Sequence, residues 1–174
     1  MNSPIKSKTD AWQSSPIQHT RVATGLSYDV AIDAFERELG HLDPAASQRL
    51  VERKAAWSEV EREVAASAGP HGLVIISQLD LGRITSLSGR EKRCALYLVG
   101  NPVIANGIID IDLRGAFYVP FRVAVIDDGG PDGAVIDYDR PSSFLATLGR
   151  PELAEVAESL DRKIDAVVAA VQAR

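Results

Sequence analysis

The middle of the chain contains the stretch Cys94-Ala95-Leu96-Tyr97-Leu98-Val99-Gly100-Asn101-Pro102, an apolar run that stops at a Gly-Asn-Pro sequence. A short run of consecutive apolar residues bounded by turn signals is typical of a strand buried inside a sheet. Glycine and proline interrupt regular structure, so we expect this strand to end at Gly100. The proline also favours extended backbone at Asn101, the residue before it. The stretch therefore predicts a buried strand followed by a polar loop.

Strand patterns flank this stretch on both sides. The segment 73–79 is rich in Val and Ile, and the segment 121–126 is a second apolar run with high strand propensity. Pro120 cannot donate a hydrogen bond to a ladder, so it predicts an edge, a bulge or a break at the start of that second run. The turn-forming residues 127–133 then predict a hairpin. Together, the expected strands are 19–26, 73–79, 94–99, 121–126 and 134–138.

Apolar residues at helical spacing mark four further segments. Ser27 is the expected N-cap of a helix that Gly40 closes, and Asp43, followed by a proline, opens the next helix. The polar segment 82–93 predicts a loop or an irregular hairpin connection, while 103–111 predicts either a short helix or an irregular apolar segment. The expected helices are 27–40, 43–68, 141–148 and 151–173.

The last expected helix has the clearest amphipathic pattern, because its apolar residues follow one face along its whole length. That face consists of Leu153, Val156, Leu160, Ile164, Val167 and Val171. The order of elements is β-α-α-β-β-(α)-β-β-α-α. It predicts an α+β fold, a compact sandwich in which a mainly antiparallel sheet is covered by helices.

The length of 174 residues fits one domain with its own core. Apolar residues make up 45% of the chain and charged residues 25%, as in ordinary globular proteins. Residues 1–18 are polar, lack the apolar core of a secretory signal, and have Trp12 as their sizeable apolar anchor. We therefore expect a flexible N-terminal tail over residues 1–18 and a single α+β domain over residues 19–174.

The charge and the cysteine content narrow the classes of function. The formal net charge is −5, whereas binding to phosphates of nucleic acid needs a basic face, so we predict no nucleic-acid partner. No segment approaches the ~20 apolar residues that span a membrane, so we predict no membrane partner and take a cytoplasmic location as the default. Cys94 is the only cysteine, which leaves no intramolecular disulfide. It is either a core thiol or, beside Lys92 and Arg93, a reactive one.

The sequence predicts neither a metal centre nor a bound cofactor. The three histidines, His19, His41 and His71, are far apart along the chain and match no metal-ligand spacing. The chain also contains no GxSxG, GxGxxG or P-loop lysine motif.

Polar residues gather at the ends of the apolar strands and form a candidate site. Asn101 either stabilises its turn through backbone hydrogen bonds or lines a ligand pocket. Arg122 lies within an apolar strand, where alternation puts it on the solvent face. If it faces a pocket instead, its guanidinium suits a carboxylate or a phosphate. Its expected acidic partners are Asp110, Asp112 and Asp139.

The start of the helix expected at 141–148 is a second candidate. Its free backbone N–H groups either bind an anion or are capped by Asp139 or Ser142. The full set of ligand-binding candidates is Asn101, Arg122, Tyr138, Asp139, Arg140, Ser142 and Ser143.

The segment 98–105 resembles the Gly-Asn-Pro signature of the domain of unknown function 302 family. After this signature the family has a proline-led strand, a Gly-containing hairpin and a short helix, which match residues 119–123, 132–133 and 138–143 here. The resemblance covers residues 70–170 well, and the helix at 43–68 indicates a longer subfamily. It implies a compact α/β fold that often forms a homodimer, and it implies no activity.

Three hypotheses for function follow. The leading one is a small-molecule-binding domain with its pocket at the Gly-Asn-Pro loop, near Arg122 and residues 138–143. The second is an enzyme of unknown class in which Arg122 orients an acidic substrate and a carboxylate such as Asp110 is the base. The third is an interaction protein that binds a partner through its helices, and a homodimer is compatible with all three.

Overall fold

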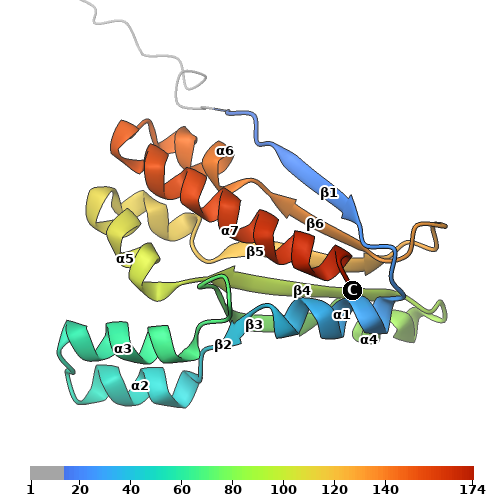
Figure 1. Ribbon diagram of the computed structural model, residues 1–174, viewed down its shortest axis with the longest axis horizontal. Coiled ribbons are helices and arrows are strands. Elements are labelled where there is room, and N and C mark those ends of the chain that lie inside the picture. The colour runs from blue at the N-terminus through green and yellow to red at the C-terminus, as the bar shows by residue number, and fades with distance from the viewer. Residues whose placement is uncertain (1–13) are drawn as a thin grey trace, which may run out of the picture.

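The computed structural model describes residues 14–174, which form a six-stranded sheet and the helices packed against it (Figure 1). The strand order is β1-β6-β5-β4-β3-β2, and all neighbouring strands are antiparallel except β2 and β3. The mainly antiparallel α+β fold expected from the sequence is therefore confirmed. The strands are β1 (His19–Ala23), β2 (Gly40–His41), β3 (Val74–Asp80), β4 (Arg93–Gly100), β5 (Phe121–Asp127) and β6 (Val135–Asp139).

The helices of the described residues connect and cover these strands. Figure 1 shows α1 and α7 lying in front of the sheet, while α2 and α3 form a separate pair below α5 in this view. Short 3-10 turns follow α4 and α6 and precede β5 and α7. The helices are α1 (Tyr28–Arg37), α2 (Pro44–Glu52), α3 (Trp57–Ser67), α4 (Leu81–Thr85), α5 (Pro102–Ile111), α6 (Pro141–Leu145) and α7 (Ala154–Gln172).

One face of the sheet carries the core. Side chains at alternate positions of the two central strands are buried, as period-two alternation requires. Phe35 of α1 and Ile164 of α7 belong to the same buried cluster, so these helices cover that face. Burial raises the pKa of the Tyr97 hydroxyl, which donates a hydrogen bond to Oε1 of Glu36 at 2.8 Å. On these two strands, β4 and β5, the core residues are Ala95, Tyr97, Val99, Phe121, Val123 and Val125.

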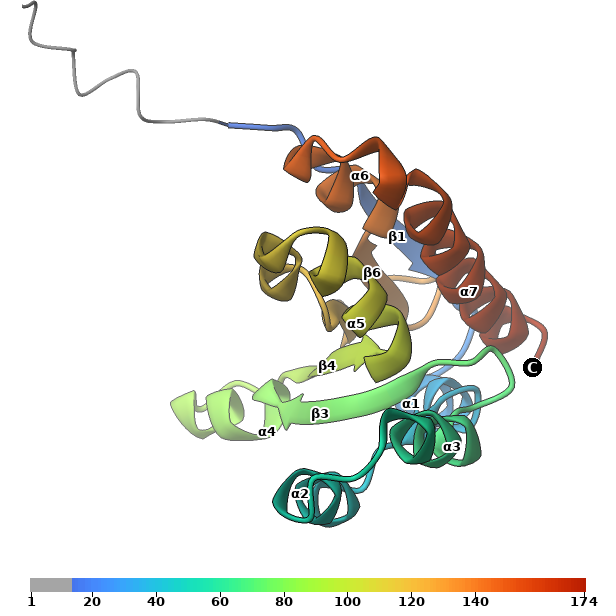
Figure 2. The same ribbon diagram turned by 90° about the vertical axis from the view of Figure 1, so that its left-hand side faces the viewer.

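The helix expected over residues 43–68 is wrong, because the chain forms two helices there. Asp43 accepts a hydrogen bond from the Ala45 N–H at 2.8 Å, so the predicted start is confirmed. The break falls at Lys54, whose φ of 51° is left-handed and incompatible with a continuing helix. Arg53 contacts Glu59 across the turn at 2.6 Å. The apolar stripe of the expected single helix is thereby folded back on itself, with α2 against α3 (Figure 2).

Other boundaries also differ from the sequence expectation. Gly40 does not close α1, which ends at Arg37, but begins the short strand β2. The segment 82–93 is not simply a loop, because α4 occupies its first part. Residues 103–111 are helical within α5, and Pro120 marks a break, since β5 begins at Phe121.

Two glycines allow the end of α3 to approach the end of α1. A Cβ on Gly40 would lie 1.7 Å from the backbone oxygen of Ser67 and 2.7 Å from the nitrogen of Gly69. A Cβ on Gly69 would likewise lie 2.7 Å from the nitrogen of Gly40. The backbones at these positions are in contact, so neither tolerates a side chain without a shift of the chain.

Residues 1–13 of the expected tail lie outside the described residues. Gln18, at its end, is tied to the domain: its N–H donates to Oγ of Ser143 at 3.0 Å, and its carbonyl accepts from the Arg140 N–H at 2.9 Å. Hydrogen bonding to the domain therefore begins at Gln18, one residue before the predicted domain boundary at residue 19.

Candidate functional site

The Gly-Asn-Pro loop joins the end of β4 to the start of α5. Asn101 is the N-cap of α5, because its Oδ1 accepts hydrogen bonds from the N–H groups of Val103 at 2.9 Å and Ile104 at 3.2 Å. Its Nδ2 donates to the carbonyl of Gly72 at 2.9 Å, which ties the loop to the segment before β3. Both polar atoms of the Asn101 amide therefore serve the turn, as the first of its two expected roles requires.

A cleft of about 390 Å³ lies beside this loop, between α3 and α5. Its polar lining residues are Asn101 and Asn106, and the amide of Asn106 donates to Oδ2 of Asp110 at 2.8 Å. No charged side chain lines it among the described residues. The cleft is therefore an apolar hollow at the carboxyl end of β4. Its larger apolar lining residues are Trp57, Val60, Ile104, Ile109, Phe121 and Leu160.

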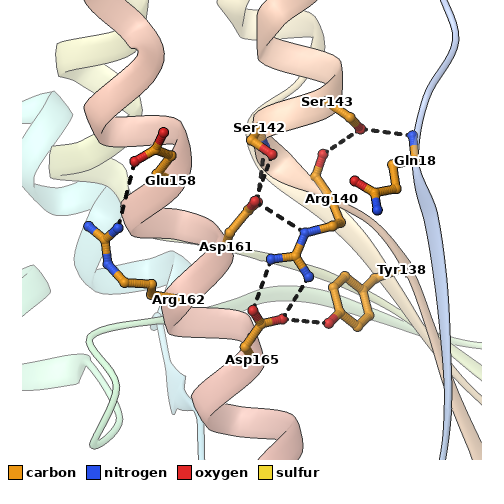
Figure 3. Close-up of polar contacts among 9 residues, drawn as sticks. All are labelled: Gln18, Tyr138, Arg140, Ser142, Ser143, Glu158, Asp161, Arg162 and Asp165. Carbon is orange, nitrogen blue, oxygen red and sulfur yellow. Dashed lines mark hydrogen bonds and ion pairs between the residues drawn. The ribbon is translucent and has the colours of Figure 1, made fainter.

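A second cluster of candidates lies where β6 leads into α6, and it faces α7 (Figure 3). The guanidinium of Arg140 donates to both oxygens of Asp165, at 3.0 and 2.9 Å, and to Oδ2 of Asp161 at 3.2 Å. These hydrogen bonds, those to Asp165 first, raise the pKa of Arg140 above its ordinary value. The predicted arginine is thus held by two carboxylates of the chain itself.

Asp161 also caps the start of α6. Its Oδ1 accepts from the Ser142 N–H at 3.0 Å, and its Oδ2 accepts from the Ser142 hydroxyl at 2.6 Å. Neither Asp139 nor Ser142 caps this helix, so that expectation is wrong. The cap comes from α7, nineteen positions further along the chain. The start of α6, which the sequence offered as an anion site, is therefore bonded to a carboxylate of the chain itself.

The remaining members of this cluster are also engaged. The Tyr138 hydroxyl donates to Oδ1 of Asp165 at 2.8 Å, and burial together with this carboxylate raises its pKa. The Ser143 hydroxyl donates to the carbonyl of Arg140 at 2.8 Å. Tyr138, Arg140 and Ser142 therefore converge, but their common partners are Asp161 and Asp165, two residues that the sequence reasoning did not single out.

Arg122 lies on the open face of the sheet. Its side chain is 71% exposed and forms an ion pair with Asp139 at 3.8 Å, while its neighbours Phe121 and Val123 are buried. The expected solvent-facing position is confirmed. Asp139 also accepts from Nδ1 of His19 at 3.0 Å, so these three side chains form a surface group.

Asp112 is a buried carboxylate held by two arginines. Its oxygens accept from Arg114 at 3.0 and 2.7 Å and from Arg150 at 2.9 Å. Hydrogen bonds from Arg114 and then Arg150 hold the pKa of this carboxyl well below its ordinary value of 3.8. Asp112 therefore pairs with these residues and not with Arg122, whereas Asp110 is exposed.

The Asp112 site predicts a loss of stability in acid. Because its pKa is lower in the folded than in the unfolded state, the unfolded chain binds more protons. The stabilisation is thus complete above about pH 4 and is lost as the pH falls further. Urea unfolding from pH 7 to about pH 2.5 should show this decline, with a shallower slope for Asp112→Asn. Asp110→Asn is the control for losing one nearby carboxylate. An equal slope in Asp112→Asn and the parent protein would contradict the assignment.

Two further observations concern the described residues as a whole. Within residues 14–174, no three His, Cys, Asp or Glu side chains come together as a metal site. No helix in that range combines the length and the apolar character that crossing a membrane requires.

Comparison with known proteins assigns the family. A family model described as "Domain of unknown function DUF302" matches residues 50–171. The crystal structure of an uncharacterized conserved protein DUF302 from Bacillus stearothermophilus is similar, with a TM-score of 0.60 and 14% identity over 87% of this chain and 96% of that chain. At this identity the likeness shows the fold alone. Comparison with curated proteins found no match. Since the family model spans most of its length, this chain belongs to the family of the domain of unknown function DUF302.

Proposed function

We propose that this chain binds a small apolar molecule in the cleft beside Gly100-Asn101-Pro102. The observation that carries the proposal is the lining of that cleft, which is apolar on α3, α5 and the start of β5. Its volume of about 390 Å³ falls in the range of small-molecule sites. Burial of the ligand's apolar surface, worth about 25 cal/mol per Å², would supply the binding free energy.

The polar side chains that line the cleft are neutral amides, so a ligand there would meet no charged group of residues 14–174. Asn101 has both polar atoms of its amide hydrogen-bonded to the backbone, so it shapes the cleft by fixing the turn. Asn106 uses its amide nitrogen on Asp110, which leaves its carbonyl oxygen as an acceptor for one polar group of a ligand. A mostly apolar molecule fits this arrangement.

The other ligand-binding candidates do not support the same pocket. Among them only Asn101 lines the cleft, and Tyr138, Arg140 and Ser142 are bonded to carboxylates of α7. The alternative of an enzyme that uses Arg122 with Asp110 draws no support from their geometry, since Arg122 pairs with Asp139. The proposal therefore rests on the apolar cleft alone.

Native mass spectrometry of gently purified protein tests the proposal. We expect an added mass that leaves on denaturation and is absent from Ala105→Trp, whose indole would fill the cleft. The matched control is Ala146→Trp, which places the same side chain in a separate hollow near α6 and should retain the added mass. If Ala105→Trp carried the same mass as the parent protein, the ligand would lie elsewhere and the proposal would be wrong.

We also infer that the chain forms a homodimer and is cytoplasmic. The native mass spectrum described above would also test the homodimer. Leu113 and Phe117, 79% and 84% exposed, give the chain an apolar surface suited to self-association. The native mass would report one copy or two. Fractionation of expressing cells would test the cytoplasmic location.

A further inference from the structure

A second apolar hollow adjoins the proposed cleft. It also measures about 390 Å³ and lies between α2 and α3. The two hollows share the lining residues Leu42, Trp57, Val60 and Pro102, so they form one groove with two lobes. We name the cleft beside the Gly-Asn-Pro loop the inner lobe and the hollow between α2 and α3 the outer lobe. The 44%-exposed Trp57 lies on their common wall.

The shape of this groove selects among apolar ligands. A compact ring system would fill one lobe and leave the other to water, whereas a flexible chain can pass Trp57 and occupy both. The turn at Lys54 creates this shape, because it folds the apolar residues of α2 back toward those of α3. None of the side chains of α2 is fully buried, and Leu50 and Val51 line the outer lobe. This helix therefore has apolar surface that a chain in the outer lobe would cover.

Charge is confined to the outer lobe. Lys54 and Glu63 line it, whereas the inner lobe has no charged lining residue. The nearby Arg49 and Arg53 have carboxylate partners, Asp43 at 3.5 Å and Glu59 at 2.6 Å. Within residues 14–174, Lys54 forms no ion pair. Its ammonium group is therefore the cation left for a ligand, while Glu63 also borders a hollow lined by Arg49 and Arg53.

We propose that the ligand is a linear monocarboxylate of the fatty-acid type, with its chain across both lobes and its carboxylate at Lys54. This inference rests on the proposed function, because it names the chemistry of a ligand in the same cleft. The apolar tail lies in the inner lobe, and the polar end lies at the outer lobe, where the charged side chains are. Each added methylene is buried until the chain fills the groove, and it should raise the affinity about fourfold.

Isothermal titration calorimetry with saturated fatty acids from octanoate to hexadecanoate tests this arrangement. We expect the affinity to rise about fourfold per methylene and then to reach a plateau once both lobes are filled. Leu50→Trp, which fills the outer lobe beside Lys54, should weaken binding of the acids and bring the plateau to a shorter chain, while compact aromatic probes of the inner lobe bind as before. Ala55→Trp is a second variant at the same lobe, and circular dichroism checks that both are folded.

The position of the carboxylate has its own control. Lys54→Gln should weaken binding of every fatty acid severalfold and leave the matched alcohols unchanged, whereas Lys54→Arg should retain the affinity for the acids. Equal losses for acids and alcohols would overturn the placement of the carboxylate at Lys54.

The possible failures can be told apart. If compact aromatic probes bind and Ala105→Trp abolishes their binding, but affinity for fatty acids does not grow with chain length, the cleft is a ligand site and the linear ligand is wrong. If Ala105→Trp leaves every measured affinity unchanged, the proposed function itself is wrong, and this inference falls with it.

Discussion

Asp161→Ala is expected to lower the free energy of unfolding by about 1 to 3 kcal/mol, because it leaves hydrogen-bond donors of Ser142 and Arg140 without their acceptor. The Asp161 side chain is 10% exposed and that of Arg140 is 23% exposed, so solvent replaces little of what is lost. The substitution also leaves the Ser142 N–H at the start of α6 without its acceptor. Arg140 keeps Asp165 but loses its second carboxylate.

Thermal unfolding followed by far-ultraviolet circular dichroism would measure this effect, with a fall in Tm of about 5 °C for a domain of this size. The control is Glu158→Ala on the same helix, which removes the exposed Glu158–Arg162 pair drawn in Figure 3, at 3.9 Å. Such surface pairs contribute about 0 to 1 kcal/mol. If Asp161→Ala destabilised the protein no more than Glu158→Ala, the cluster would not hold α6 to α7 as described.

Gly40→Ala is expected to destabilise the fold by at least about 3 kcal/mol, because the new methyl group would overlap backbone atoms that have no room to yield. The clash is with the oxygen of Ser67 and the nitrogen of Gly69, and neither is the end of a flexible side chain. Relief requires the end of α3 to move away from β2. Since Val60 of α3 lines both lobes of the groove, the substitution should also weaken ligand binding.

Gly107→Ala is the matched control, because it makes the same chemical change within α5 where a Cβ would meet no atom within 4 Å. Alanine has the higher helix propensity, so this variant should gain about 0.5 to 1 kcal/mol. Urea unfolding of the two variants should therefore give changes of opposite sign. A Gly40→Ala protein as stable as the parent would show that the chain accommodates the methyl group by a shift that the packing does not suggest.

Much of the fold was predictable because its core elements follow simple periodicities. The apolar run at residues 94–99 is typical of a buried strand, and the apolar residues of 153–171 recur at helical spacing. Burial of one face of each element requires these patterns, so both were readable in the sequence. The break of the helix at 43–68 was not predictable in the same way. Residues 53–56 contain neither glycine nor proline, and Lys54 adopts a conformation that its residue type rarely does. That turn therefore has no recognisable local signal in the sequence.

The site was less predictable than the fold. Polar residues at strand ends suggested a ligand pocket, but Arg140 and Ser142 have partners on α7 that no local pattern connects to them. The sequence showed only that Asp161 and Asp165 flank an apolar stripe. A pocket was expected at the Gly-Asn-Pro loop, but its apolar lining could not be predicted, because its walls come from α3, α5, β5 and α7, which are far apart along the chain. For Asn101 the sequence offered both a turn role and a pocket role, and the structure has the backbone hydrogen bonds that the turn role requires.

Trp57, on the wall between the two lobes, gives the protein an optical reporter of its own. It is one of two tryptophans, and the other is Trp12 in the N-terminal region. Indole emission depends on contact with water, and any molecule that occupies either lobe must exclude water from part of this ring. In a Trp12→Phe background, the wavelength of the emission maximum would therefore follow occupancy of the groove without an added dye. Protein-free fractions of a cell extract could then be screened for a ligand by the emission of the purified protein.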